Sequence, residues 1–331
     1  MPETSTSSHP WLVADIGGTN ARFGLVHRPG GPVESVQAVK GRDHPTPQDA
    51  ARAYLDAVLG PGGHVGRAAL AIAAPVGTDK IKLTNSHWVV SHPDIARDLQ
   101  LADVRLLNDF EALALSLPGL KVDGGGLRPF GGGEALPGLP KAVVGPGTGL
   151  GVAGCVPLGQ RWMALATEGG HVTVAPADPY EDALLQALRP QHPHLSAERL
   201  LSGSGLPTLH RGVCLVEDLP HTPLPPEEIT RLALEGQDRA AQVTLDTFCA
   251  MLGTFAGNVA LTLGARGGLY IGGGISGVLA DTLVASRFRE RFEAKGRFQP
   301  YMAAIQTALV TAPHAALDGA AAALAQDGVP A

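Results

Sequence analysis

The chain has 331 residues, 44% of them apolar, with a formal net charge of −6 and an isoelectric point near 6.0. This length exceeds that of a usual single core, so about two domains are expected. An acidic chain without a basic cluster is not expected to bind nucleic acid or an anionic membrane, and a small molecule is the simpler partner.

Residues 1–10 are polar and lack the charged-then-apolar pattern of a signal peptide. The longest apolar stretch, residues 251–265, is interrupted by glycine and asparagine. It is also too short to span a bilayer, which takes about 20 apolar residues. The three cysteines, at positions 155, 214 and 249, are too scattered for a disulfide framework or a zinc site. These features predict a cytoplasmic protein.

The first third alternates between expected strands and helices. Strands are expected at residues 11–16, 21–27, 33–39, 68–74 and 104–107. Thr46 caps an expected helix at 47–59 that has proline at its first position, and a short helix is expected at 93–100. Residues 118–140, rich in glycine and proline, predict a crossover to a second domain, with a mobile stretch at 124–133.

In the second half, Asp178 caps an expected helix that begins at Pro179, with Glu181 in a capping-box position. Apolar residues at helical spacing predict a long central helix at 237–263. A charged helix at 286–294, a strand at 304–310 and an alanine-rich helix at 314–325 are expected to follow.

A glycine turn lies between the first two expected strands. Adjacent glycines let successive N–H groups converge on an anion, and a hydroxyl and an amide follow them. A structural turn without a ligand is the alternative. The residues concerned are Asp15, Gly17, Gly18, Thr19, Asn20 and Arg22.

The same arrangement recurs at residues 141–156, where Gly147 aligns with Gly17. A third glycine run, residues 272–274, follows another short strand. One fold unit that occurs twice and clasps a nucleotide explains all three turns. The dinucleotide fingerprint does not apply, because neither of the first two turns opens into a helix with an acidic residue about 20 positions on.

With these ordered motifs the chain resembles the bacterial glucokinases of the hexokinase-type group, within the actin-like ATPase superfamily. The matching segments are residues 15–22, 107–111, 145–151, 168–171, 196–205 and 270–275. The resemblance implies a two-domain actin-like (ribonuclease H-like) α/β fold with duplicated units around a central cleft. The implied domains are residues 10–119 with 309–331, and 120–308. Without a cysteine-rich motif, the chain differs from the zinc-containing ROK (repressor and sugar-kinase) group.

The resemblance implies ATP-dependent phosphorylation of D-glucose at its C6 hydroxyl, with Asp109 as the general base. Phosphoryl transfer needs in-line positioning, charge neutralisation and a base for the hydroxyl proton. Taken alone, Asp109 could instead cap a helix at 110–117. Asn108 is expected to hydrogen-bond the sugar.

Further sugar ligands implied by the resemblance are Glu168, His171 and Glu198, with Asn85 a weaker candidate. A carboxylate and an imidazole can pair with vicinal hydroxyl groups. The alternative for Glu168 and His171 is a polar turn in which His171 starts a strand at 172–174. The alternative for Glu198 is an acidic residue in the first turn of a helix capped by Ser196.

The cofactors implied are ATP and Mg²⁺, the latter held by Asp15 through water. The implied nucleotide-binding residues are Asp15, Gly17, Gly18, Thr19, Asn20, Gly147, Thr148, Gly149, Gly273 and Gly274. Two departures from the family pattern are Pro146, which removes a backbone donor, and Ser204, where relatives often have proline. A homodimer is expected. There are two alternative functions. One is a kinase for another hexose or amino sugar, and the other is a non-catalytic nucleotide-gated module.

Overall fold

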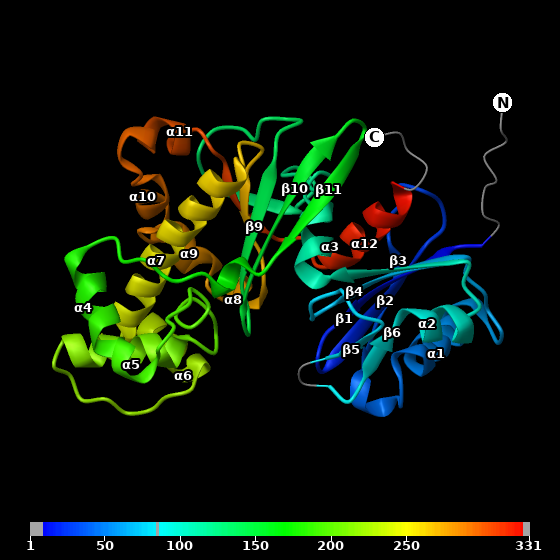
Figure 1. Ribbon diagram of the computed structural model, residues 1–331, viewed down its shortest axis with the longest axis horizontal. Helices are drawn as coiled ribbons and strands as arrows, with labels where there is room; N and C mark the ends of the chain where they lie inside the picture. The colour runs from blue at the N-terminus through cyan, green and yellow to red at the C-terminus, as the bar shows by residue number, and fades with distance from the viewer. Residues whose placement is uncertain (1–8, 84–85, 327–331) are drawn as a thin grey trace. The chain divides into compact units, whose positions relative to one another are not determined.

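The computed structural model describes residues 9–83 and 86–326, which form two compact α/β units (Figure 1). The first unit comprises the described residues through Leu120, Pro157–Ala166, and those from Pro313 on; the second comprises Lys121–Val156 and Thr167–Ala312. The domain limits implied by the resemblance stay a prediction. In the described part of the chain, every helix is too short or too polar to cross a membrane.

The first unit is built on a five-stranded sheet with the order β3-β2-β1-β4-β7. Its strands are β1 (Trp11–Ile16), β2 (Asn20–Val26), β3 (Glu34–Lys40), β4 (Arg67–Ile72) and β7 (Asp103–Asn108), and β5 (Lys80–Lys82) pairs separately with β6 (Val89–Ser91). Its helices are η1 (Gly41–Asp43), α1 (Pro47–Leu59), α2 (His92–Asp98), α3 (Asp109–Ser116) and α12 (Ala315–Ala325).

Strand β1 is buried on both faces of this sheet. Leu12 and Ala14 belong to a core cluster with residues of α1 and α2, whereas Trp11 and Val13 belong to a cluster with residues of α3 and α12. Because side chains alternate along a strand, a strand covered on both sides reads as one continuous apolar run. The carboxyl ends of β1 and β7 deliver Asp15 and Asn108.

A six-stranded sheet with the order β11-β10-β9-β12-β13-β8 belongs mostly to the second unit, whereas the end of β10 and most of β11 fall in Pro157–Ala166 of the first unit. Its strands are β8 (Leu127–Gly131), β9 (Lys141–Pro146), β10 (Leu150–Leu158), β11 (Arg161–Thr167), β12 (Leu269–Ile271) and β13 (Thr307–Val310). The helices of the second unit are η2 (Gly169–His171), α4 (Pro179–Leu188), η3 (Arg189–Gln191), α5 (Leu206–Val216), α6 (Pro226–Leu234), α7 (Arg239–Leu263), α8 (Gly274–Val278), α9 (Ala280–Ala285), α10 (Phe288–Glu293), η4 (Gly296–Phe298) and α11 (Gln299–Ala303).

The expected duplication is confirmed by the sheet topology. Strands β9, β10, β12 and β13 take the places of β1, β2, β4 and β7, with β11 in the place of β3. In both sheets the first pair is antiparallel and the two following pairs are parallel. Both glycine turns therefore close the same hairpin of a repeated unit.

One sequence expectation for this sheet is wrong. Residues 118–140 were expected to contain only an irregular crossover with a mobile stretch at 124–133, yet β8 lies there. It pairs with β13 at the edge of the sheet. An edge strand tolerates Pro129, because it has only one partner to satisfy.

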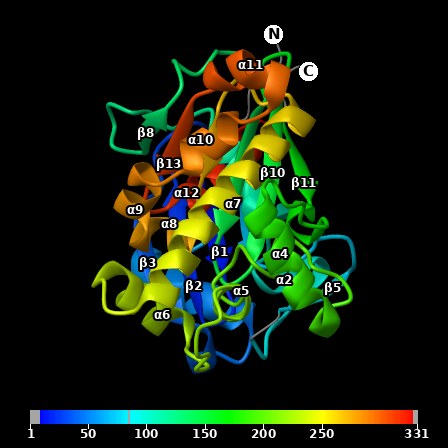
Figure 2. The same cartoon turned by 90° about the vertical axis from the view of Figure 1, so that its left-hand side faces the viewer.

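Helix α7 forms the spine of the second unit (Figures 1 and 2). It contacts β9 and is packed by α5, α6 and α10. Its Met251 and Phe255 are buried in the core, as expected. The helix begins at Arg239, two residues later than expected, because Asp238 caps it by accepting a hydrogen bond from Ala241 N at 2.7 Å.

Close packing of α12 on α3 yields a stability prediction. A Cβ atom added at Gly319 would lie 1.7 Å from the carbonyl oxygen of Ala112, and backbone cannot give way as a flexible side chain does. We expect Gly319→Ala to lower the free energy of unfolding by about 1–3 kcal/mol or more, measured by urea denaturation. The control is Gly277→Ala in α8, where the added atom meets open space. Equal stability of the two variants would contradict the packing argument.

Candidate functional site

The first glycine turn joins β1 to β2 in the first unit. The amide of Gly17 donates to the carbonyl of Asn20 at 3.0 Å and closes the turn. Within the described residues, the amides of Gly18 and Thr19 have no hydrogen-bond partner. Thr19 and Asn20 are exposed. Two free N–H groups on an exposed turn are donors suited to an anion.

Asp15 lies at the base of this turn. Its Oδ2 accepts a hydrogen bond from Arg22 Nη1 at 3.3 Å across the hairpin. Burial raises the pKa of Asp15, while the positive charges of Arg22 and His314 oppose that rise. The described residues contain no cluster of three or more His, Cys, Asp or Glu side chains arranged for a metal. A single carboxylate suits Mg²⁺ held through water together with substrate phosphates.

Asp109 is the first residue of α3, directly after β7. The helix cap is Asn108, whose Oδ1 accepts from Phe110 N at 2.9 Å, and Glu111 Oε2 accepts from Asn108 N at 3.2 Å. The alternative in which Asp109 caps this helix is therefore wrong. Asp109 Oδ1 accepts a hydrogen bond from Phe110 N at 3.0 Å. Asn108 Nδ2 also donates to Ala74 O, so its amide is held on both sides.

The environment of Asp109 makes its carboxylate an unusually strong base. Burial raises its pKa to about 6, and the negative charge of Asp15 adds to the rise against the opposing Phe110 N–H. General-base catalysis is most effective when the pKa approaches the working pH. Asp109 therefore suits proton abstraction better than an exposed aspartate would.

The second glycine turn is one residue shorter than the first. The Gly147 amide donates to Gly149 O at 2.8 Å, and Pro146 pairs with Leu150. Ser204 Oγ donates to Thr148 O at 2.9 Å. Ser204, which stands where relatives often have proline, thus ties the turn to the segment that follows Ser202.

The third glycine run lies beside this second turn. Gly272 N donates to Val144 O at 3.0 Å. Gly273 has a φ of +83°, and a Cβ there would lie 2.8 Å from the carbonyl oxygen of Pro146. Only glycine fits both the conformation and the contact. Two of the three predicted nucleotide turns therefore meet within the second unit.

These two turns border a cavity of about 840 Å³ in the second unit. Gly147, Thr148, Gly203, Ser204 and Gly274 line one side. The other side comes from α6 and its neighbours: Leu206, Pro226, Glu227, Thr230, Arg231, Leu234, Phe248, Val278 and Leu279. Sequence reasoning missed α6, although paired prolines and two acidic residues in its first turn are the usual signal of a helix start.

The predicted sugar ligands of the second unit come together. His171 Nε2 lies 3.9 Å from Glu168 Oε2, and His171 Nδ1 lies 3.8 Å from Glu198 Oε1. Glu198 Oε2 accepts a hydrogen bond from Leu150 N at 2.9 Å, which anchors it to the start of β10. All three side chains are partly exposed, and Glu198 is the most buried of them, at 31% exposure.

The expected polar turn is present, but the described residues form neither the strand expected at 172–174 nor the helix expected after Ser196. His171 ends the turn η2, and only an isolated bridge between Thr173 and Ser196 follows in place of a strand. Ser196 Oγ accepts from Arg199 N at 3.2 Å, but the segment is a turn rather than a helix. The remaining candidate, Asn85, lies outside the described residues.

Comparison with known proteins decides the family. The family model described as Glucokinase matches residues 12–327. The chain belongs to the glucokinase family. A glucokinase of Chromobacterium violaceum is 45% identical over 97% of this chain and 91% of its own length.

Solved structures place the glucokinase-family chain in the actin-like ATPase fold, as expected. A glucokinase from an Antarctic psychrotroph has a TM-score of 0.89 and 36% identity, covering 96% of this chain and 98% of that one. A ROK family glucokinase from Streptomyces griseus, in complex with glucose and AMPPNP, has a TM-score of 0.61 and 20% identity, covering 96% and 100%. The second likeness is one of fold alone.

Proposed function

We propose that this chain transfers the γ-phosphoryl group of ATP to the C6 hydroxyl of D-glucose, with Asp109 as the general base. The observation that carries this proposal is a half-buried carboxylate at the start of α3, directly after β7, in surroundings that raise its pKa to about 6. Family membership supports the substrate, since the relatives above are named glucokinases.

The proposed nucleotide site uses the three glycine turns. The free amides of Gly18 and Thr19 suit phosphate oxygens, and the cavity beside Gly147 and Gly274 has an apolar wall suited to a base and a glycine edge suited to phosphates. Mg²⁺, when bound, neutralises charge on the transferring phosphates. We propose that Asp15 holds it through water.

The proposed sugar site uses Glu168, His171 and Glu198 as hydrogen-bonding partners of the hydroxyl groups, with Asn108 as a further partner and Asn85 as a weaker candidate. Carboxylates accept from hydroxyl groups, and the imidazole can donate or accept. Asp109 takes the proton of the attacking hydroxyl as its oxygen bonds to the γ-phosphorus, while the bond from that phosphorus to the bridging oxygen breaks and ADP leaves. We also propose cytoplasmic residence and a homodimer, on family resemblance, and no nucleic-acid or membrane partner, on net charge.

A substrate panel tests the proposed sugar. ATP consumption with glucose, mannose, fructose and glucosamine should show glucose with the highest kcat/KM. A sugar lacking a hydroxyl that Glu168 or Glu198 binds should react far more slowly, because the carboxylate loses its hydrogen-bonding partner in the sugar complex. Equal rates for all four sugars would favour a general hexose kinase, and binding of ATP without turnover of any sugar would favour a nucleotide-gated module.

The pH dependence of kcat/KM tests the base. Asp109 must be ionised to accept a proton, and its pKa is raised to about 6. Activity should therefore be constant above about pH 7 and fall about tenfold per pH unit below about pH 6. A profile flat down to pH 5 would contradict the assignment.

A further inference from the structure

A second cavity of about 560 Å³ lies in the first unit, beside the first glycine turn. The turn residues Gly18, Thr19 and Asn20 form one wall. Lys40 and Arg42 come from the end of β3 and from η1, and Ser86 and His87 complete the lining. The proposed function assigns no role to these last four residues.

Hydrogen bonds join the walls of this cavity to one another. The Gly41 amide donates to Thr19 O at 2.9 Å, which ties η1 to the glycine turn. Trp88, which is buried, donates from Nε1 to His44 O at 2.9 Å, and His87 Nε2 lies 3.0 Å from the same oxygen. The segments bearing Lys40, Arg42 and His87 are thus held around the turn by contacts independent of any ligand.

The cavity is positively charged on a chain whose net charge is −6. Lys40 is exposed, and its ammonium group has no ion pair or hydrogen bond within the described residues. Arg42 forms an ion pair with Asp43 at 3.6 Å, and both side chains are largely exposed, so that pair is weak. Among the described residues, no acidic side chain lines the cavity.

We propose that this cavity is a binding site for the phosphate group of a phosphorylated small molecule. Lys40 and Arg42 would supply charge-assisted hydrogen bonds, and the free amides of Gly18 and Thr19 would supply backbone donors. The identity of the ligand rests on the proposed function: the phosphate monoester that the chain itself would form is the sugar phosphate product. Lys40 and Arg42 then set the strength of product inhibition. The terminal phosphate of the nucleotide is the other source of the same chemistry.

Calorimetric titration of the full chain tests this site without turnover. The probes are inorganic phosphate, glucose 6-phosphate and ATP, and the variants are Lys40→Ala and Arg42→Ala. The control is Arg28→Ala, an exposed cation of the same unit that does not line the cavity. Unchanged melting temperatures establish that each variant is folded.

We expect each cavity variant to weaken glucose 6-phosphate and inorganic phosphate binding about 3- to 10-fold, and the control less than about 2-fold. A loss confined to ATP would support the phosphate site and assign it to the nucleotide. The proposal would be overturned if both variants bound each of the three ligands with the same affinity as the wild type. Because the titration measures binding directly, its outcome for the cavity does not depend on whether the chain phosphorylates glucose.

Discussion

Replacing Asp109 by asparagine should lower kcat about 10²- to 10⁴-fold and, at the same time, stabilise the protein. The loss follows because an amide cannot accept the hydroxyl proton. The gain follows because the pKa of Asp109 in the folded state, about 6, lies above its value of about 3.9 in an unfolded chain. Ionising Asp109 therefore costs folding free energy, and asparagine removes that cost.

The sign of this linkage defines the experiment. The stability gain of Asp109→Asn should be absent below about pH 4, appear between about pH 4 and 6, and stay constant above, at about 1–2 kcal/mol after solvent screening. Urea denaturation at pH 4 and pH 8 measures it. Asp318→Asn is the matched control, since burial also raises the pKa of that carboxylate on α12. The control should gain stability at pH 8 and keep its activity; loss of activity in both variants would contradict a role specific to Asp109.

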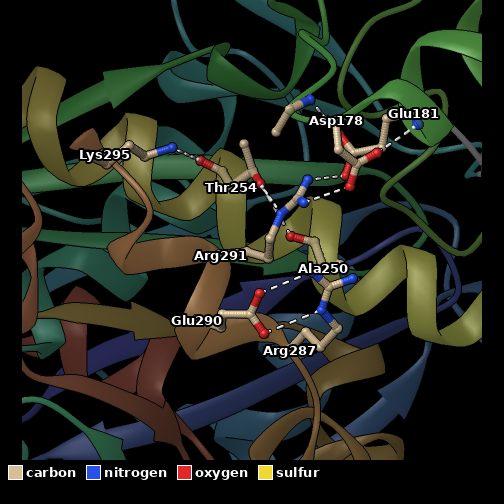
Figure 3. A network of polar contacts seen from close by, with 9 residues as sticks. Asp178, Glu181, Ala250, Thr254, Arg287, Glu290, Arg291 and Lys295 are labelled. Atoms are coloured by element: carbon tan, nitrogen blue, oxygen red, sulfur yellow. Dashed lines mark hydrogen bonds and ion pairs between the residues drawn. The ribbon is translucent and has the colours of Figure 1, made fainter.

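The largest expected loss of stability is that of Arg291→Ala, by about 3–5 kcal/mol. Figure 3 shows the guanidinium of Arg291 directed at the carboxylates of Asp178 and Glu181. Nη1 lies 2.7 Å from Asp178 Oδ2, Nη2 pairs with Glu181, and Nε donates to Thr254 Oγ1 at 3.2 Å. Arg291 and Glu181 are both almost fully buried. Truncation would leave the Glu181 charge without a partner in the core.

The same helix region provides the control for this measurement. Arg287 pairs with Glu290 at 2.9 Å, but both side chains are more than half exposed, so Arg287→Ala should cost less than about 1 kcal/mol. Replacing Arg291 and Glu181 together by methionine should recover most of the loss, because no buried charge then remains unpaired. A double variant no more stable than Arg291→Ala would assign the loss to packing instead of charge.

Local signals predicted those elements whose ends are set by neighbouring residues. Helix α1 begins and ends where expected, because Thr46 accepts from Asp49 N and proline occupies the first position. The cap of α3 was predictable too, since Glu111 stands three residues after Asn108 and completes a capping box. Asp109 was named as the alternative cap instead, because aspartate and asparagine cap helices equally well.

Features that depend on distant partners could not be read from the sequence. Strand β8 has no periodicity of its own, and β13, which pairs with it, lies almost at the other end of the chain. Glu181 was expected to complete a capping box with Asp178, but its Oε2 accepts from Ala177 N, and its other oxygen pairs with Arg291. The role of α6 in lining the cavity likewise follows from tertiary packing alone.

Motifs predicted which residues of the second unit would cluster, and the role of these residues as sugar ligands stays a prediction. Glu168, His171 and Glu198, the proposed sugar ligands, were named from motifs, and two hydrogen-bonded turns bring them together. Motif spacing carries that information because these residues sit on turns that lie next to the ends of strands. Neither the raised pKa of Asp109 nor the cavity beside Lys40 could be inferred, since both depend on burial and on neighbours remote in sequence.

The most direct test of phosphoryl transfer to glucose is identification of the product. The purified chain is incubated with glucose, ATP and Mg²⁺, and glucose 6-phosphate is measured by an enzyme-coupled assay, with Asp109→Asn alongside. We predict stoichiometric formation of glucose 6-phosphate and ADP by the wild type, and a rate at least about 10²-fold lower for the variant. A wild type that binds ATP yet forms no glucose 6-phosphate would contradict the account.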